Sequence, residues 1–132
     1  MATIRFVKLA ALLLCALSLT VAQERDGNFS IRFEPTAVLQ SGAPIPFQIT
    51  VHDADHKPLA DAKVTLQIET VNHTQVKVFP APAVDPRGNP GVYVAKPVFP
   101  AAGEWNVYVE VRRQNGRWDE MSARTIQFNV PE

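Results

Sequence analysis

Apolar and polar residues alternate along most of this chain from residue 28 onward. Successive side chains of a β-strand point to opposite faces, so a period of two predicts strands with one buried face and one solvated face. This part of the chain carries no convincing amphipathic helix pattern. The alternation predicts seven strands, at residues 29–34, 47–52, 63–69, 76–79, 92–98, 105–112 and 126–130.

Turn-forming residues separate these runs and support the division. Pro58 and aspartates mark a turn at residues 53–61, and Asn115 and Gly116 form the dipeptide that tight hairpins prefer. Residues 83–91 hold two prolines and two glycines, and we expect them to form a surface loop. Seven short strands in about 110 residues predict an all-β fold, an antiparallel β-sandwich of the immunoglobulin-like type, with a small closed barrel as the structural alternative.

The strongest alternation in the chain surrounds Trp105. One face of this strand carries Trp105, Val107, Val109 and Val111, and the other carries Asn106, Tyr108, Glu110 and Arg112. We therefore expect Trp105 to line the core between the two sheets.

The N-terminal segment has the pattern of an export signal. Arg5 and Lys8 precede an apolar run from Leu9 to Ala22, and small residues stand where a signal peptidase would cleave. The run is shorter than the roughly 20 residues of a membrane-spanning helix, so we expect no stable membrane span after cleavage. The predicted organisation is a signal peptide at residues 1–22 and an immunoglobulin-like domain at residues 23–132, located in the periplasm or secreted. The only cysteine, Cys15, lies inside the signal, so the mature domain is expected to fold without disulfides.

Charge excludes some classes of partner. The chain has 13 basic and 13 acidic residues, and removing Arg5 and Lys8 with the signal leaves 11 against 13, a net charge of −2. Nucleic-acid binding depends on clustered cations that neutralise phosphates, so we expect no nucleic-acid partner. Anionic membrane surfaces are disfavoured for the same reason.

Three short motifs stand out in the mature chain. The first runs from His52 to Leu59 and continues with Ala62, Val64 and Leu66; the second is Gly91 to Tyr93; the third runs from Phe99 to Trp105. Together these motifs resemble those of the bacterial YtkA-like and FixH-like group of exported immunoglobulin-like domains. The resemblance covers most of the mature chain, from about residue 35 to residue 130. It implies an exported sandwich without catalytic activity, found in envelope or copper-associated contexts. Several relatives carry loops rich in methionine and histidine, whereas the mature chain here has one methionine, Met121.

A histidine- and aspartate-containing turn is the candidate metal site. His52, Asp53, Asp55 and His56 lie within five residues, and His73 follows in another turn. Imidazoles beside carboxylates suit Cu(II) or Zn(II), so one hypothesis is a copper or zinc site formed by His52, Asp55, His56 and His73. The alternative is a solvated turn whose aspartates bond to nearby backbone amides. Apart from this hypothetical metal, we expect no cofactor.

A surface that binds another protein is the candidate interface. Tyr108 and Trp118 occupy positions where the alternation predicts solvent, and Arg112, Arg113, Arg117 and Arg124 are close to them in sequence. Tyrosine, tryptophan and arginine often anchor protein interfaces. We therefore expect an envelope protein partner that contacts Tyr108, Arg112, Arg117 and Trp118. The alternative is that Trp118 covers its hairpin and the arginines only protect an edge strand. No serine stands in a strained nucleophile turn, so we expect no enzymatic activity.

Overall fold

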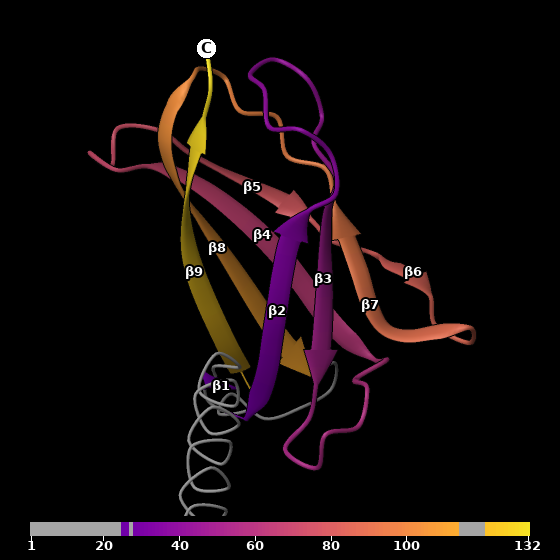
Figure 1. The fold of residues 1–132 in the computed structure, drawn as a ribbon. Helices are drawn as coiled ribbons and strands as arrows, with labels where there is room; N and C mark the ends of the chain where they lie inside the picture. The colour runs from indigo at the N-terminus through magenta and orange to yellow at the C-terminus, as the bar shows by residue number, and fades with distance from the viewer. Residues whose placement is uncertain (1–24, 27, 114–120) are drawn as a thin grey trace, which may run out of the picture.

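Two antiparallel sheets stack face to face in the computed structural model of the chain, which describes residues 25–26, 28–113 and 121–132 (Figure 1). The first sheet has the order β1-β2-β3-β7-β6, and the second has the order β5-β4-β8-β9. The strands of the first sheet are β1 (Arg25–Asp26), β2 (Phe29–Pro35), β3 (Phe47–His52), β7 (Asn89–Ala95) and β6 (Ala83–Asp85). Those of the second are β5 (Val76–Pro80), β4 (Ala62–Thr70), β8 (Gly103–Arg113) and β9 (Met121–Val130). The predicted all-β sandwich is confirmed, and the sheets do not close into the alternative barrel.

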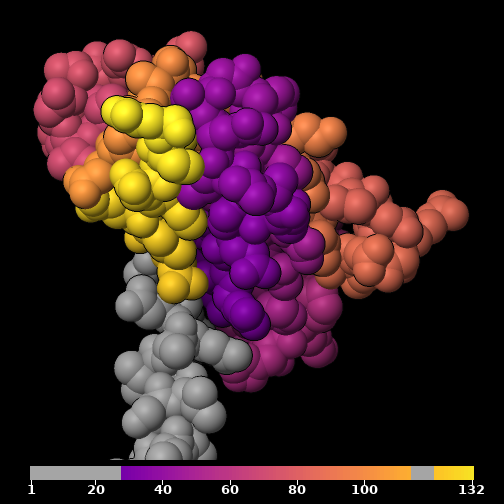
Figure 2. All heavy atoms as spheres, turned by 45° about the horizontal axis from the view of Figure 1, so that its top comes forward, coloured from indigo at the N-terminus to yellow at the C-terminus, as the bar shows by residue number. Residues whose placement is uncertain are grey.

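The strand pattern departs from the prediction at several places within the described residues. β1 and β6 add to the seven predicted strands, and β9 begins five residues earlier than expected. The predicted loop at residues 83–91 is wrong at both ends, because Ala83–Asp85 form β6 and Asn89 begins β7. Pro90 has no backbone N–H, but this costs no hydrogen bond to β3, because the pairing of β7 with β3 begins only at Val92. The hairpin formed by β6 and β7 projects from the body of the domain (Figure 2).

Trp105 lies in the core as predicted, with 2% of its surface exposed. Its ring packs edge-on against Phe99 with centroids 5.8 Å apart, and its indole N–H donates a hydrogen bond of 3.0 Å to the carbonyl of Ala101. The buried indole therefore has its one polar group satisfied. The third motif, Phe99 to Trp105, is thus a packed corner between the sheets.

The first two motifs meet in space around Tyr93. The Tyr93 hydroxyl, buried between the sheets, donates to the Leu59 carbonyl at 2.6 Å and accepts the Ala62 N–H at 3.1 Å. Gly91 approaches the same turn so closely that an added Cβ would lie 2.7 Å from the Val51 carbonyl oxygen, and its φ of +81° favours glycine. The motif residues therefore fasten the turn at residues 53–61 to the sheet.

The chain passes from one sheet to the other between β5 and β6. The Ala81 N–H donates to the Val64 carbonyl in the second sheet, at 3.0 Å. One residue later, the Pro82 carbonyl accepts the Val94 N–H in the first sheet, at 3.1 Å. Pro80 and Pro82 thus lie where the chain changes partners, which is a position that tolerates the missing N–H of proline.

Candidate functional site

The solvent-facing side of the four-stranded sheet is the surface that contains the predicted interface residues. We call it the outer face, and it consists of the side chains of β4, β5, β8 and β9 that alternate with the buried ones. Its middle row is fixed by strand register, which places Tyr108 beside Gln67 on β4 and Thr125 on β9, and Gln67 beside Val78 on β5. Tyr108 therefore lies at the centre of the outer face, half-buried between its neighbours.

Two apolar side chains extend this row to the edge of the sheet. Val76 and Val78 on β5 are 51% and 61% exposed. Alternation puts both on the outer face, and register sets Val76 beside Glu69 and Val78 beside Gln67. A half-buried aromatic ring with exposed valines near it is a surface that can bury apolar area against a partner.

Charged groups are sorted along the strands of the outer face. Lys63 and Arg112 are register partners at one end of the sheet, whereas Glu69 and Glu104 lie towards the other end. The outer face therefore has a basic end and an acidic end, with uncharged side chains in the middle row. Glu110 moderates the basic end, since its Oε1 lies 3.5 Å from an Nη of Arg112.

Tyr108 keeps its hydroxyl proton at neutral pH. Burial raises the pKa of Tyr108, and the nearby negative charge of Glu110 raises this pKa further, while Arg112 acts in the opposite direction. The hydroxyl is therefore both a donor and an acceptor at the centre of the outer face.

The remaining predicted interface residues separate into two groups. Arg117 and Trp118, like the predicted Asn115–Gly116 hairpin, lie outside the described residues, so their contribution stays a prediction. Arg124 does not join Tyr108: it lies on the opposite side of β9 and donates a hydrogen bond of 2.9 Å to the Ile31 carbonyl. The grouping of Arg124 with the surface arginines was therefore wrong, because its strand position has the same parity as Ile126, which packs against the core.

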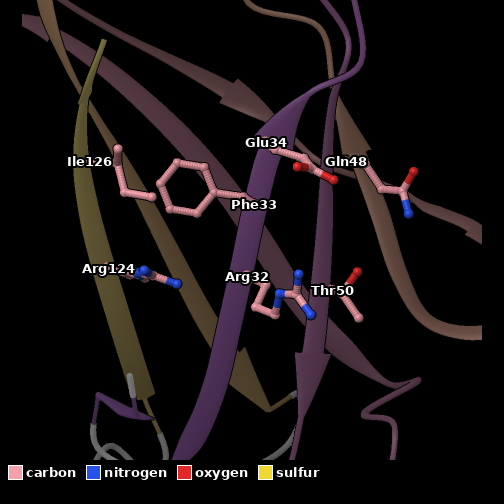
Figure 3. Close-up of a pocket in the computed structure, with 7 residues that line it drawn as sticks. All are labelled: Arg32, Phe33, Glu34, Gln48, Thr50, Arg124 and Ile126. Atoms are coloured by element: carbon pink, nitrogen blue, oxygen red, sulfur yellow. The ribbon is translucent and has the colours of Figure 1, made fainter. Parts of the chain in front are cut away.

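A hollow of about 390 Å³ lies beside Arg124 at the border between β2 and β9 (Figure 3). It is lined by Arg32, Phe33, Glu34, Gln48, Thr50, Arg124 and Ile126. At this border the Ser122 hydroxyl accepts the Phe29 N–H at 2.9 Å, so side chains of β9 bond to the backbone of β2. Arg124 and Ser122 thus serve to join the two sheets.

The structure divides the predicted metal ligands between two ends of the sandwich. His52 ends β3, and Asp55 and His56 follow in the next turn, whereas His73 lies in the turn after β4 (Figure 1). The nine residues of β4 span about 30 Å between these turns. His73 instead contacts Glu69 through its Nδ1, at 2.5 Å. In the described ranges, no three histidine, cysteine, aspartate or glutamate side chains gather to hold a metal ion.

The first turn is organised by Asp53. One carboxylate oxygen of Asp53 accepts the N–H groups of Asp55 at 2.8 Å and Lys57 at 3.0 Å. These hydrogen bonds, chiefly that from Lys57, lower the pKa of Asp53. His56 follows with a φ of 62°, in the left-handed region. This is the geometry of the solvated turn, while copper or zinc binding by His52, Asp55 and His56 stays a prediction.

Sequence reasoning missed the exposed valines of β5 and the inward position of Arg124. Alternation showed that Val76 and Val78 share a face, but it could not show which face is buried in a weakly apolar edge strand. The signal for Arg124 was present in its two-residue spacing from Ile126, which ties both side chains to one side of the strand.

Comparisons with known proteins agree with the motifs. The family described as YtkA-like matches residues 22–110. Among solved structures, the chain is similar to a DUF4426 family protein from Pseudomonas aeruginosa PAO1, with a TM-score of 0.51 and 14% sequence identity. That similarity covers 81% of this chain and 94% of the other and concerns the fold alone. No curated protein matches the chain.

Proposed function

Because the chain belongs to the YtkA-like family, we propose that it is a non-enzymatic, exported immunoglobulin-like module that binds an envelope protein through its outer face. The observation that carries the proposal is the row formed by Tyr108, Gln67 and Val78, with Val76 next to it on the edge strand. Isolated exposed valines are ordinary on a protein surface, but here two lie on one edge strand, and only the uncharged Gln67 separates Val78 from the half-buried ring of Tyr108.

Export is supported by the sequence of residues 1–22, which lie outside the described residues. The basic start, the short apolar run and the small residues before Gln23 have the order of a cleavable signal. The described part of the chain contains no helix with the length and hydropathy needed to cross a bilayer.

A binding role is favoured over catalysis by how the polar side chains are used. The hydroxyls of Ser122 and Tyr93 are both buried and both bond to backbone groups that link strands or turns. These groups stabilise the fold and are not available to a substrate.

Photo-crosslinking in the native cell tests the proposal. A benzoylphenylalanine at Thr125, beside Tyr108 on the outer face, is expected to give a crosslinked product of higher mass. The same group at Gln48, exposed on the other sheet, is the matched control and is expected to give none. Adding Tyr108→Ala should abolish the Thr125 product. Equal crosslinking from both positions, or none from Thr125, would contradict a binding role for the outer face.

A further inference from the structure

We infer that the outer face binds a second copy of this chain, in a two-fold dimer with the axis across the strands at the row of Tyr108. This inference rests on the proposed function, since it names the partner class of the same surface. The inference comes from the order of charged side chains along the strands. The outer face has a basic end and an acidic end, so reversing the strand direction of a second copy brings opposite charges together.

The two-fold operation decides which side chains face one another. An axis lying in the interface plane and perpendicular to the strands places each strand over its own counterpart with reversed direction. Tyr108 then faces Tyr108 of the second copy. Arg112, four residues towards one end of β8, faces Glu104, which lies four residues towards the other end.

The rows between these positions also match. Glu110 faces the amide of Asn106 in the second copy, and Glu69 on β4 faces Thr65. Gln67 and Val78, which share the row of the axis, face their own counterparts. No two like charges face each other directly on any one strand, although Glu110 lies diagonally across from Glu69 of the second copy, one strand away. The attraction is therefore concentrated at the ends of β8, where Arg112 faces Glu104. A surface made only for a different protein would have no need to complement itself.

The size of the outer face limits the area that a dimer can bury. The four strands have 9, 5, 11 and 10 residues in β4, β5, β8 and β9. With a rise of about 3.3 Å per residue and a spacing of about 4.8 Å between strands, they cover roughly 550 Å² per copy. The total of roughly 1,100 Å² is just below the range of about 1,200–2,000 Å² typical of stable protein interfaces. Aligned sheets pack face to face in this manner in β-sandwiches. We therefore expect a reversible dimer with a Kd in the micromolar range.

Reversing the charge of Arg112 or of Glu104 gives a specific test. Sedimentation equilibrium of the exported chain measures the Kd of the dimer. Arg112→Glu and Glu104→Arg should each weaken dimerisation tenfold or more, because each sets like charges against one another. An equimolar mixture of the two variants should dimerise again, since every Glu then faces an Arg. Arg87→Glu, on the hairpin between β6 and β7 and away from the outer face, is the charge-matched control and should leave the Kd unchanged.

The mixture also separates loss of contact from loss of fold, because misfolded variants would not regain association. A wild-type chain that stays monomeric at several hundred micromolar, or a mixture no more dimeric than its components, would overturn the inference. The proposed function would survive that result if the Thr125 crosslink contained a different protein. A crosslinked product of twice the chain mass, made only of this chain, would support the dimer.

Discussion

Removing the Tyr93 hydroxyl by Tyr93→Phe is expected to destabilise the domain without creating a cavity in its core. Tyr93 is 1% exposed, and its hydroxyl joins the carbonyl of Leu59 to the N–H of Ala62. Phenylalanine fills nearly the same volume, so the loss is confined to these two hydrogen bonds. Each contributes about 1 kcal/mol net, and a buried backbone group left without a partner costs about 1–3 kcal/mol.

The expected decrease in the free energy of unfolding is therefore about 2–4 kcal/mol, a large part of the roughly 5–15 kcal/mol of a typical domain. Urea unfolding followed by far-ultraviolet circular dichroism measures this quantity, and the midpoint should fall without a change in slope. Tyr108→Phe is the matched control, because its hydroxyl has no hydrogen-bond partner among the described residues. A Tyr93→Phe variant that loses less than about 0.5 kcal/mol would refute the role given to this hydroxyl.

Four further results are expected. Truncation of Trp105 to alanine should cost about 3–5 kcal/mol of unfolding free energy in the same urea assay, and a loss below 1 kcal/mol would mean that the indole is not in the core. Gly91→Ala should cost about 2 kcal/mol or more, because the added methyl group meets the Val51 carbonyl at a positive φ; unchanged stability would exclude this close approach. Burial raises the pKa of Tyr93, and that of Tyr108 is raised too, so the folded state holds these protons more tightly than the unfolded chain. The contribution of these two tyrosines to stability should therefore be constant below about pH 10 and be lost as the pH rises beyond it, and the alkaline loss should be less steep in Tyr93→Phe, as thermal melts above about pH 8 can show. Calorimetry with Cu(II) and Zn(II) should show binding tighter than about micromolar that His52→Ala abolishes if the predicted metal site is real, whereas absence of heat would remove that hypothesis.

The resemblance motifs acquire a physical meaning in the fold. They are far apart in sequence, yet Gly91 and Tyr93 meet the turn at residues 53–61 through one close approach and two hydrogen bonds. Gly91 is required by its backbone conformation, and Tyr93 is required by the hydrogen bonds of its buried hydroxyl. These motifs therefore identify a fold and a way of stabilising it without naming a ligand.

The fold class and the core of this protein can be read from the order of its residues alone. Period-two alternation placed Trp105, Ile31 and Leu66 among the buried residues, because a strand has only two sides and the more apolar side avoids water. The ends of the strands depend on pairing with neighbours and not on alternation alone. Pro86 and Gly88 indicated a loop, but hydrogen bonding to β7 drew the residues before them into β6.

Which surface residues lie together depends on how the strands pair in the folded domain. His56 and His73 both lie in turns, with φ values of 62° and 61°, yet β4 separates them because the two turns lie at opposite ends of that strand. Val78 and Tyr108 are thirty residues apart in sequence, and strand pairing through Gln67 puts them in one row. Alternation along a strand follows from local backbone geometry, whereas neighbours across strands depend on sheet order and register, which the whole chain sets by pairing its backbone and filling its core.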